Sequence, residues 1–281
     1  DWRYLFLRNS GTPAQEYPRD KFCGSKYVQS NTENTFMEVL DDLKNGRQVL
    51  YSGTACQIAG LKRFLEKKGI LFPTDKLTTI DIVCHGVMSP LLWKKNLEEM
   101  SKKIKGSIDT IQFRDKRFGW DSHIETYGSD QELLQSRRYT SIFYSHNALR
   151  PSCYHCPYAS VVRDSDITLA DAWGVKKLAP EWDSTKGISL VLVNTDNGMR
   201  LMENISENLI MKEVPLSEML QPNLLSPTKQ PNSRNEFWQL FETKGYSYVA
   251  DQCEREQDSL RRKNRWKARI VRILRLCHLK H

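Results

Sequence analysis

The stretch that most constrains this chain is Arg150-Pro-Ser-Cys-Tyr-His-Cys-Pro, in which two residues separate Cys153 from Cys156. Cysteines at this spacing can bind one metal centre, because both sulfurs can point into the same tight turn. The spacing alone fits an iron–sulfur cluster, a zinc site or a redox-active dithiol. A dithiol is disfavoured because Pro151 and Pro157 flank the pair, where a strand-to-helix junction would be expected.

Two more cysteines follow predicted strands. The apolar runs Gln48–Ser52 and Leu77–Val83 predict strands, and Cys56 and Cys84 come within a turn of their ends. A predicted helix follows each strand, which indicates a parallel α/β unit whose strands share one carboxyl edge. Ligands bind at that edge in open α/β folds. Although a lone cysteine is more often inert core, these two can complete a four-thiolate shell with the two-cysteine turn.

The pattern predicts an α/β fold with a parallel or mixed sheet, flanking helices, cluster-binding loops at the strand carboxyl ends and a basic helical tail. We place one domain in residues 1–220 and a linker with the tail in residues 221–281. The boundary follows from residues 221–235, which hold three prolines and three asparagines. Residues 1–24 are rich in loop signals, so we expect upstream sequence to belong to the same domain.

The net charge of +8 belongs mostly to the tail. Residues 254–281 hold ten Lys/Arg and three Asp/Glu, which leaves 32 basic and 31 acidic residues elsewhere. A diffuse nucleic-acid-binding surface is therefore not indicated. Arg261–His281 has apolar residues on one helical face and arginines beside or opposite them. This pattern suits an anionic membrane surface or an acidic partner, and a frayed basic terminus is the simpler alternative.

The chain has no run of 18 apolar residues, and its start does not read as a signal peptide. We therefore expect a cytoplasmic protein, peripheral to the membrane where the tail binds one. In that compartment the seven cysteines would be reduced or metal-bound. No catalytic triad order and no Walker-type loop supports a hydrolase or a kinase.

Five further motifs surround these cysteines in a fixed order, which makes a chance match implausible. They are Gly24-Ser-Lys-Tyr-Val-Gln-Ser30, Gly53-Thr-Ala-Cys-Gln-Ile-Ala-Gly-Leu61, Asp81-Ile-Val-Cys-His-Gly-Val-Met-Ser-Pro90, Phe113-Arg-Asp-Lys116 and Asp166-Ile-Thr-Leu-Ala-Asp171. With the two-cysteine turn, this set resembles the beta-subunit family of coenzyme F420 hydrogenases and dehydrogenases. The resemblance covers about residues 20–195.

The resemblance implies an iron–sulfur flavoprotein oxidoreductase. Members pass electrons between a [4Fe–4S] cluster and FAD, and on to a deazaflavin, a tetrapyrrole or an unidentified acceptor. It also implies that Cys56, Cys84, Cys153 and Cys156 are the cluster ligands. Bacterial relatives often occur beside enzymes of polysaccharide synthesis.

The chain departs from the family pattern in several places. Ala55 and Met88 stand where proline is common, and Ala170 where glycine is common; these changes are local. Longer members begin with a ferredoxin-like domain and a Ser/Gly-rich segment, which helps to hold the flavin. This sequence shows neither, so we expect a ferredoxin-like domain or redox partner protein to supply the missing part.

Other residues on the motif segments are candidates for contacts with a cofactor. Lys26, Arg114 and Lys116 could stabilise a reduced flavin or its pyrophosphate, although solvated surface charges are an equal alternative for each. Asp171, at a strand end, could accept a hydrogen bond from a cofactor, and His85 could donate a proton near the cluster.

Two hypotheses follow from the sequence. The first is a redox enzyme in which a cluster connects a flavin to a redox partner. The second is a non-catalytic, metal-stabilised scaffold or interaction module.

Overall fold

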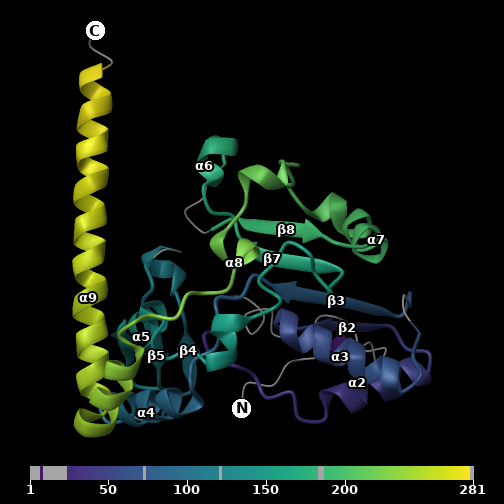
Figure 1. Cartoon of the computed structure of the whole chain (residues 1–281), viewed down its shortest axis with the longest axis horizontal. Coiled ribbons are helices and arrows are strands. Elements are labelled where there is room, and N and C mark those ends of the chain that lie inside the picture. Colours follow the sequence, from purple (N-terminus) through teal and green to yellow (C-terminus); the bar gives the residue numbers. More distant parts are fainter. Residues whose placement is uncertain (1–6, 9–23, 72–73, 120–121, 183–186, 279–281) are drawn as a thin grey trace. The chain divides into compact units, whose positions relative to one another are not determined.

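The computed structural model describes residues 7–8, 24–71, 74–119, 122–182 and 187–278 (Figure 1). The chain forms two compact units, and each is assembled from segments that are distant in sequence. Residues 229–281 group with residues 87–150. The sequence predicted a separate linker and tail over residues 221–281. Unit 1 comprises residues 1–23, 29–86 and 151–228, and unit 2 comprises residues 24–28, 87–150 and 229–281.

Unit 1 contains a five-stranded mixed sheet in the order β1-β2-β3-β7-β8 (Figure 1). The central strands β2 (Val49–Ser52), β3 (Leu77–Ile82) and β7 (Ile167–Asp171) are parallel, and the edge strands β1 (Leu7–Arg8) and β8 (Ser189–Val193) are antiparallel to their neighbours. The predicted α/β class with a mixed sheet is therefore confirmed.

Two amphipathic helices cover one face of this sheet. Helices α2 (Thr35–Lys44) and α3 (Ala55–Lys67) repeat apolar residues every three or four positions, and those residues are buried. Each buried side chain of this kind stabilises the fold by about 1.5–3 kcal/mol. The core that they form with the sheet comprises Val39, Leu40, Leu43, Ile58, Leu61, Leu65, Val49, Tyr51 and Leu77.

The rest of unit 1 consists of short elements after the cysteine turn. A 3-10 turn (Pro151–His155) precedes β7, and three short helices follow it, with further 3-10 turns at Ser206–Asn208 and Leu216–Glu218. A second apolar cluster packs against β8 and contains Ala172, Leu190 and Met219. The helices are α6 (Val175–Leu178), α7 (Asp196–Ile205) and α8 (Pro222–Leu225).

Unit 2 is built on an antiparallel sheet of β4 (Thr110–Gln112), β5 (Glu125–Gly128) and β6 (Leu133–Ser136). A 3-10 turn (Lys116–Phe118) follows β4. Apolar side chains of helix α4 (Pro90–Met100) pack on this sheet, and helix α5 (Arg138–Ser145) packs along α9.

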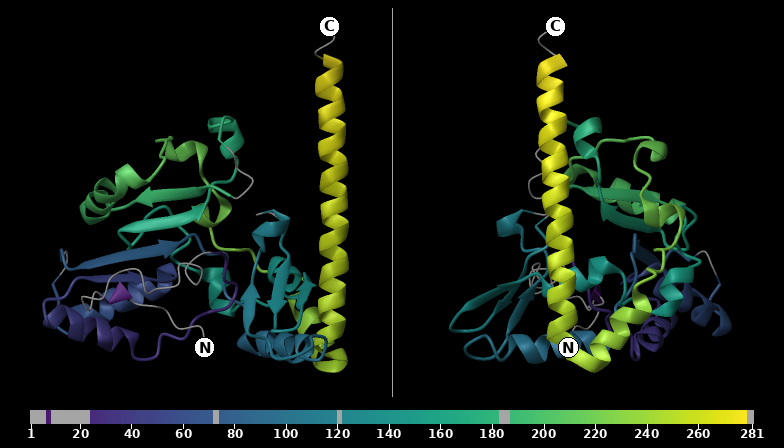
Figure 2. Two further views of the ribbon diagram at one scale, coloured as in Figure 1. Left: turned by 180° about the vertical axis from the view of Figure 1, so that it is seen from behind. Right: turned by 60° about the vertical axis from the view of Figure 1, so that its left-hand side comes forward.

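Helix α9 spans Arg234–His278 and bends at Gly245 (Figure 2). Gly245 has φ 79° and ψ 179°, a conformation that is essentially restricted to glycine. After the bend, Tyr246, Val249 and Cys253 are buried in unit 2. Among the α9 side chains that the structure describes, none beyond Cys253 is buried. No helix in the described ranges has both the length and the apolar character needed to cross a bilayer.

A buried polar network holds the elements of unit 2 together. Glu125 on β5 is fully buried, and its carboxylate accepts hydrogen bonds from the Tyr127 hydroxyl (2.8 Å) and the Thr140 amide. Asn96 on α4 donates to Tyr127 (2.7 Å) and accepts from Tyr246 on α9 (2.8 Å). One chain of hydrogen bonds thus joins β5, α4, α5 and α9, and it orders them because unmade bonds among buried groups are costly.

We expect the Glu125 carboxyl to make the stability of unit 2 pH-dependent. Burial raises its pKa in the folded state, so the folded chain keeps a proton that the unfolded chain releases above about pH 4.3. The unfolding free energy of the wild type should therefore fall, relative to that of Glu125→Gln, as the pH rises from 4.3 toward neutrality. Urea unfolding at several pH values measures this difference, and a constant difference would contradict the prediction.

Candidate metal centre

The candidate site lies at the carboxyl edge of the three parallel strands of unit 1. In the parallel register, Ser52 pairs with Ile80 and Ile82 pairs with Leu169, so β2, β3 and β7 end along the same side of the sheet. The segments that leave this edge carry Cys56, Cys84 and Asp171. Parallel pairing therefore gathers residues that are far apart in sequence, at the edge where open α/β sheets bind ligands.

Cys56 lies in the first turn of α3. The turn is fixed by Gln57, whose side-chain Oε1 accepts a hydrogen bond from the Thr54 amide (2.9 Å). The Thr54 hydroxyl lies 3.1 Å from the Cys56 sulfur, and the Cys56 residue is exposed. The Cys56 sulfur is thus accessible at the start of α3, a position suitable for a metal ligand.

Cys153 and Cys156 lie in and just after the 3-10 turn Pro151–His155, and both are half-buried. The Tyr154 side chain between them is buried and anchors the turn in unit 1. His155, also between the two cysteines, is exposed and lies 3.4 Å through Nδ1 from the Pro151 carbonyl. The turn thus exposes both thiols partially while a buried aromatic ring fixes its backbone.

The surroundings of Cys84 include the other three thiols. The pKa of its thiol is raised to about 12, mainly by burial and to a smaller extent by the neighbouring thiols of Cys153, Cys56 and Cys156. The Gly86 amide, which donates a hydrogen bond to the Cys84 sulfur at 3.4 Å, opposes this increase. The other three cysteines that the sequence singled out are therefore near enough to Cys84 to affect its pKa.

This donor set has the chemistry of a soft metal or cluster site. Thiolates are the ligands of iron–sulfur clusters and of structural zinc. A bound cation would attract all four thiolates, and this attraction would outweigh their mutual repulsion. No disulfide joins any of these four cysteines. Within the described ranges, no three Cys, His, Asp or Glu side chains form a ready-made metal-binding group. The residues fit a thiolate-bound centre by their identity and grouping, and ligation would require them to move closer.

The ends of β3 and β7 carry further polar groups of unit 1. The His85 ring lies edge-on to the Trp173 ring with 5.7 Å between centroids, and the His85 carbonyl accepts a hydrogen bond from the Thr228 hydroxyl (2.6 Å). The backbone carbonyl of Asp171 accepts from the Gln221 side chain (2.5 Å). Asp171 and His85 thus lie in segments at the same sheet edge as Cys84.

The three basic candidates belong to unit 2. An isolated β-bridge pairs Ser25 with Phe113, and Arg114 Nη1 lies 3.4 Å from the Ser25 hydroxyl. Lys26 is exposed and donates to the Gly24 carbonyl, and Lys116 is exposed in the turn after β4. Two segments nearly ninety residues apart thus bring these cations into one part of unit 2.

Unit 1 contains a buried ion pair that was not predicted from the sequence. The side chains of Arg163 and Asp81 are 2% and 0% exposed, and Arg163 Nη2 lies 3.2 Å from Asp81 Oδ2. Burial raises the pKa of Asp81, which the Thr168 hydroxyl and the Arg163 charge oppose. The available signal was an aspartate inside a strand that reads as buried on both faces, because such a charge requires a partner.

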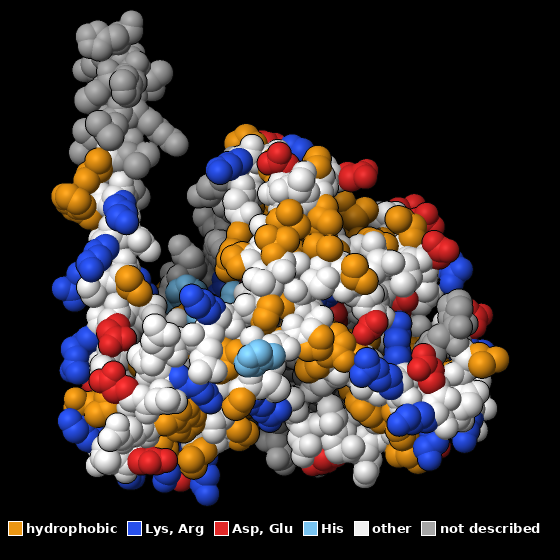
Figure 3. Space-filling model, viewed as in Figure 1, with side chains coloured by type: hydrophobic (Ala, Val, Ile, Leu, Met, Phe, Trp, Pro, Cys, Tyr) orange, Lys and Arg blue, Asp and Glu red, His pale blue; other side chains and the backbone are white. Residues whose placement is uncertain are grey.

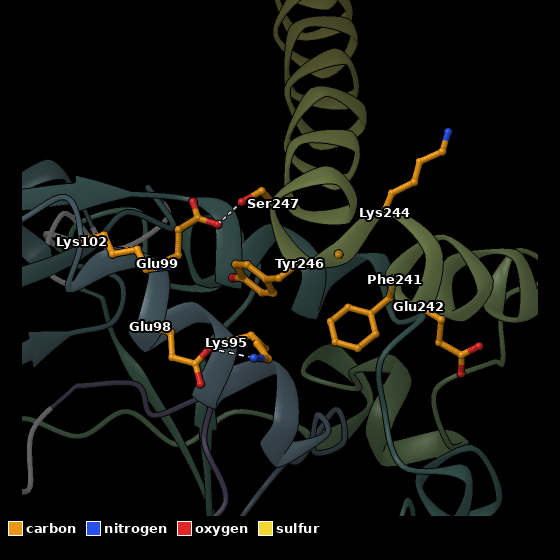
Figure 4. Close-up of a pocket in the computed structure, with 10 residues that line it drawn as sticks. Lys95, Glu98, Glu99, Lys102, Phe241, Glu242, Lys244, Tyr246 and Ser247 are labelled. Atoms are coloured by element: carbon orange, nitrogen blue, oxygen red, sulfur yellow. Dashed lines mark hydrogen bonds and ion pairs between the residues drawn. The ribbon is translucent and has the colours of Figure 1, made fainter.

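A surface pocket of unit 2 lies at the bend of α9, and no cysteine is among its lining residues. Figure 4 shows the Tyr246 side chain directed toward α4 and Ser247 hydrogen-bonded to Glu99. Mixed charges line this pocket, and Lys95 pairs there with Glu98 on the same helix. These neighbouring charges neutralise each other, so the pocket has no distinct chemistry to offer a ligand.

The fold and the thiol set define an α/β protein with a candidate thiolate-bound centre at its sheet edge. The family profile for the C terminus of the coenzyme F420 hydrogenase/dehydrogenase beta subunit matches residues 46–219, and the chain belongs to this family. The match includes all four cysteines and confirms the family predicted from the motifs.

Among solved structures, a chain of the F420-reducing [NiFe] hydrogenase complex from Methanosarcina barkeri, determined with xenon derivatization, is similar. The TM-score is 0.43 and the sequence identity is 14%, over 85% of this chain and 70% of that one. No curated protein matches the sequence.

The thiol environments predict an order of alkylation in the metal-free protein. At pH 8 we expect iodoacetamide to modify exposed Cys56 at least roughly tenfold faster than Cys84, because the thiolate is the nucleophile and the pKa of Cys84 is raised. Cys253, whose pKa burial raises to about 11, is the matched slow control. Time-resolved peptide mass spectrometry measures the rates, and equal rates for Cys56 and Cys84 would be the contradicting result.

Proposed function

We propose that this protein is an electron-transfer oxidoreductase whose four cysteines hold a [4Fe–4S] cluster. The observation that carries the proposal is the placement of Cys56, Cys84, Cys153 and Cys156 in unit 1, with Cys56 and Cys84 at the carboxyl edge of its parallel strands. Membership of a hydrogenase and dehydrogenase subunit family supports a redox role. When bound, such a cluster supplies one-electron transfer.

The residues of this chain would prepare the site in several ways. Cys56 presents an exposed sulfur in the first turn of α3, and the Gly86 amide stabilises negative charge on Cys84 through its hydrogen bond. The buried Tyr154 ring fixes the turn that presents the other two sulfurs. Burial of Cys84 limits its contact with water, which strengthens every interaction with a bound charge.

FAD is the proposed second cofactor, and it supplies two-electron chemistry when bound. The clustered cations of unit 2, Lys26, Arg114 and Lys116, would hold its pyrophosphate or the reduced ring by charge. Asp171, at the end of β7, would accept a hydrogen bond from a cofactor bound at the sheet edge of unit 1. A redox partner protein or a ferredoxin-like domain would complete the flavin site and exchange electrons with the cluster.

Anaerobic purification of the full chain tests the cluster. We expect about four irons and matching acid-labile sulfide per chain, with a broad absorption shoulder near ~400 nm that dithionite bleaches. Cys84→Ser, Cys153→Ser and Cys156→Ser should each lower bound iron to below about one atom per chain, because a three-thiolate shell is incomplete. Cys253→Ser, which alters a buried thiol of unit 2, is the matched control and should keep its iron.

The same preparation separates the two hypotheses for the function. Flavin absorption, in the chain alone or after addition of a redox partner, would support the enzyme. One zinc and no iron would overturn electron transfer and would leave a metal-stabilised scaffold as the function.

We also propose that the distal part of α9 binds an anionic membrane surface and so holds a cytoplasmic protein at the membrane. Beyond Cys253 no described side chain of the helix is buried, and Trp266 and Leu260 are 66% and 50% exposed. Figure 3 shows Lys and Arg side chains along this part of the helix. Exposed apolar groups among basic ones are typical of helices that lie in a membrane interface.

Vesicle co-sedimentation tests the membrane proposal. The protein should bind phosphatidylglycerol-containing vesicles and not pure phosphatidylcholine, and binding should weaken as salt rises. The triple change R262E/K263E/K267E should weaken binding by roughly a hundredfold or more, since each basic residue contributes about 1 kcal/mol. The matched control K102E/K103E/K105E reverses three exposed lysines elsewhere and should bind as the wild type does. Equal binding by both triple variants would contradict the proposal.

A further inference from the structure

The Arg163–Asp81 pair is the most deeply buried ion pair that the structure describes in unit 1. The two side chains are 2% and 0% exposed. Removing two charges from water carries a penalty that their mutual attraction repays only when further hydrogen bonds are made. The other hydrogen bonds that Arg163 donates therefore show which backbone segments the ion pair holds in place.

The Arg163 guanidinium joins the two backbone segments that carry three of the cysteines. Nη1 donates a hydrogen bond to the Tyr158 carbonyl at 2.6 Å, and Nη2 donates to the Ile82 carbonyl at 2.8 Å. Tyr158 lies two residues after Cys156, and Ile82 lies two residues before Cys84. One planar group thus connects the end of the cysteine turn with the end of β3.

Two further contacts fix the orientation of the guanidinium. Nε donates to the Thr168 hydroxyl on β7 at 3.3 Å, and Asp81 balances the charge from β3. Bonds to three groups in different directions require the rigid fork of an arginine. A lysine at this position would keep the charge but could not make the same set of bonds.

We propose that Arg163 and Asp81 form a clamp that positions the Cys153–Cys156 turn against the end of β3 and thereby sets the distance from these two sulfurs to Cys84. The clamp deepens the proposed function, since it positions the ligands of the proposed cluster. Both residues act through the backbone, and neither is a ligand. Among the described residues, no three Cys, His, Asp or Glu side chains form a group that could bind a metal. The clamp therefore limits the distance that the thiols must move to bind one, and it does not by itself form the site.

A matched control exists on the same pair of strands. The Asp166 carboxylate is buried and accepts hydrogen bonds from the Thr79 amide (2.7 Å), the Thr79 hydroxyl (2.7 Å) and the Thr195 hydroxyl (2.6 Å). It too joins β3 to the β7 segment, but at the opposite end of β7 from the cysteine edge. Asp166→Asn therefore weakens a buried polar link of unit 1 without touching a cysteine segment.

The test measures thiol proximity in the metal-free full chain. A short bifunctional thiol reagent is added, and the cross-link from Cys84 to Cys153 or Cys156 is quantified by peptide mass spectrometry. We expect Arg163→Gln and Arg163→Lys to reduce this cross-link at least fivefold, whereas Asp166→Asn keeps the wild-type yield. Loss of the cross-link in Arg163→Lys would show that the planar guanidinium is required and that a positive charge alone is not sufficient. Wild-type yield in a folded Arg163→Gln protein would overturn the proposal.

A double variant covers the case in which Arg163→Gln fails to fold. Replacing both partners, as in R163M/D81L, leaves no unpaired buried charge and is often tolerated. Its fold is checked by thermal unfolding and circular dichroism. Loss of the cross-link in this folded protein supports the clamp, and a wild-type yield rejects it.

Bound iron separates the clamp from the proposed cluster. If the wild type lacks iron but Arg163→Gln loses the cross-link, the clamp stands and electron transfer fails. If Arg163→Gln keeps both its iron and the cross-link, the clamp fails and the proposed function stands.

Discussion

The parallel pairing of β2, β3 and β7 is the constraint on which the candidate site depends. Parallel strands end on one side of a sheet, so the loops that follow them must meet there. In this chain, Cys56 and Cys84 follow β2 and β3, and Asp171 is the last residue of β7, so all three lie at that edge. An antiparallel arrangement of the same strands would send alternate loops to opposite edges and separate the thiols.

This part of the molecule was predictable from the sequence because it rests on local signals. Apolar runs followed by Cys56 and Cys84, with amphipathic helices after them, determine both the parallel unit and the edge at which the cysteines lie. The apolar spacing in α2 and α3 is likewise a local signal, and the residues with that spacing form the core under the sheet. The cofactor and the electron acceptor stay predictions, since they depend on chemistry that a sequence pattern does not specify.

Other features were not predictable, because they depend on pairings between distant segments. Asp81 signalled that a buried charge needed a partner, but nothing local to Arg163 identified it as that partner. Glu125 reads as an ordinary strand residue, and its burial follows only from contacts with Tyr127 and Thr140, of which Tyr127 is in turn bonded to Asn96. The assembly of each unit from separated segments is also invisible in local periodicity, and so residues 229–281 read as an appended tail.

Cys84 and Cys153 lie on either side of the interruption in the sequence of unit 1. The chain leaves unit 1 after Gly86 and returns at Pro151, so Cys84 and Cys153 each lie two residues from a crossing. Within unit 2, Arg150 donates its amide to the Val87 carbonyl at 2.8 Å, which keeps the two crossing segments together. Within unit 1, the Arg163 clamp aligns the segments of Cys84 and Cys153 through its hydrogen bonds to the Ile82 and Tyr158 carbonyls. The alignment of these thiols therefore rests on a side chain that is separated in sequence from both cysteines.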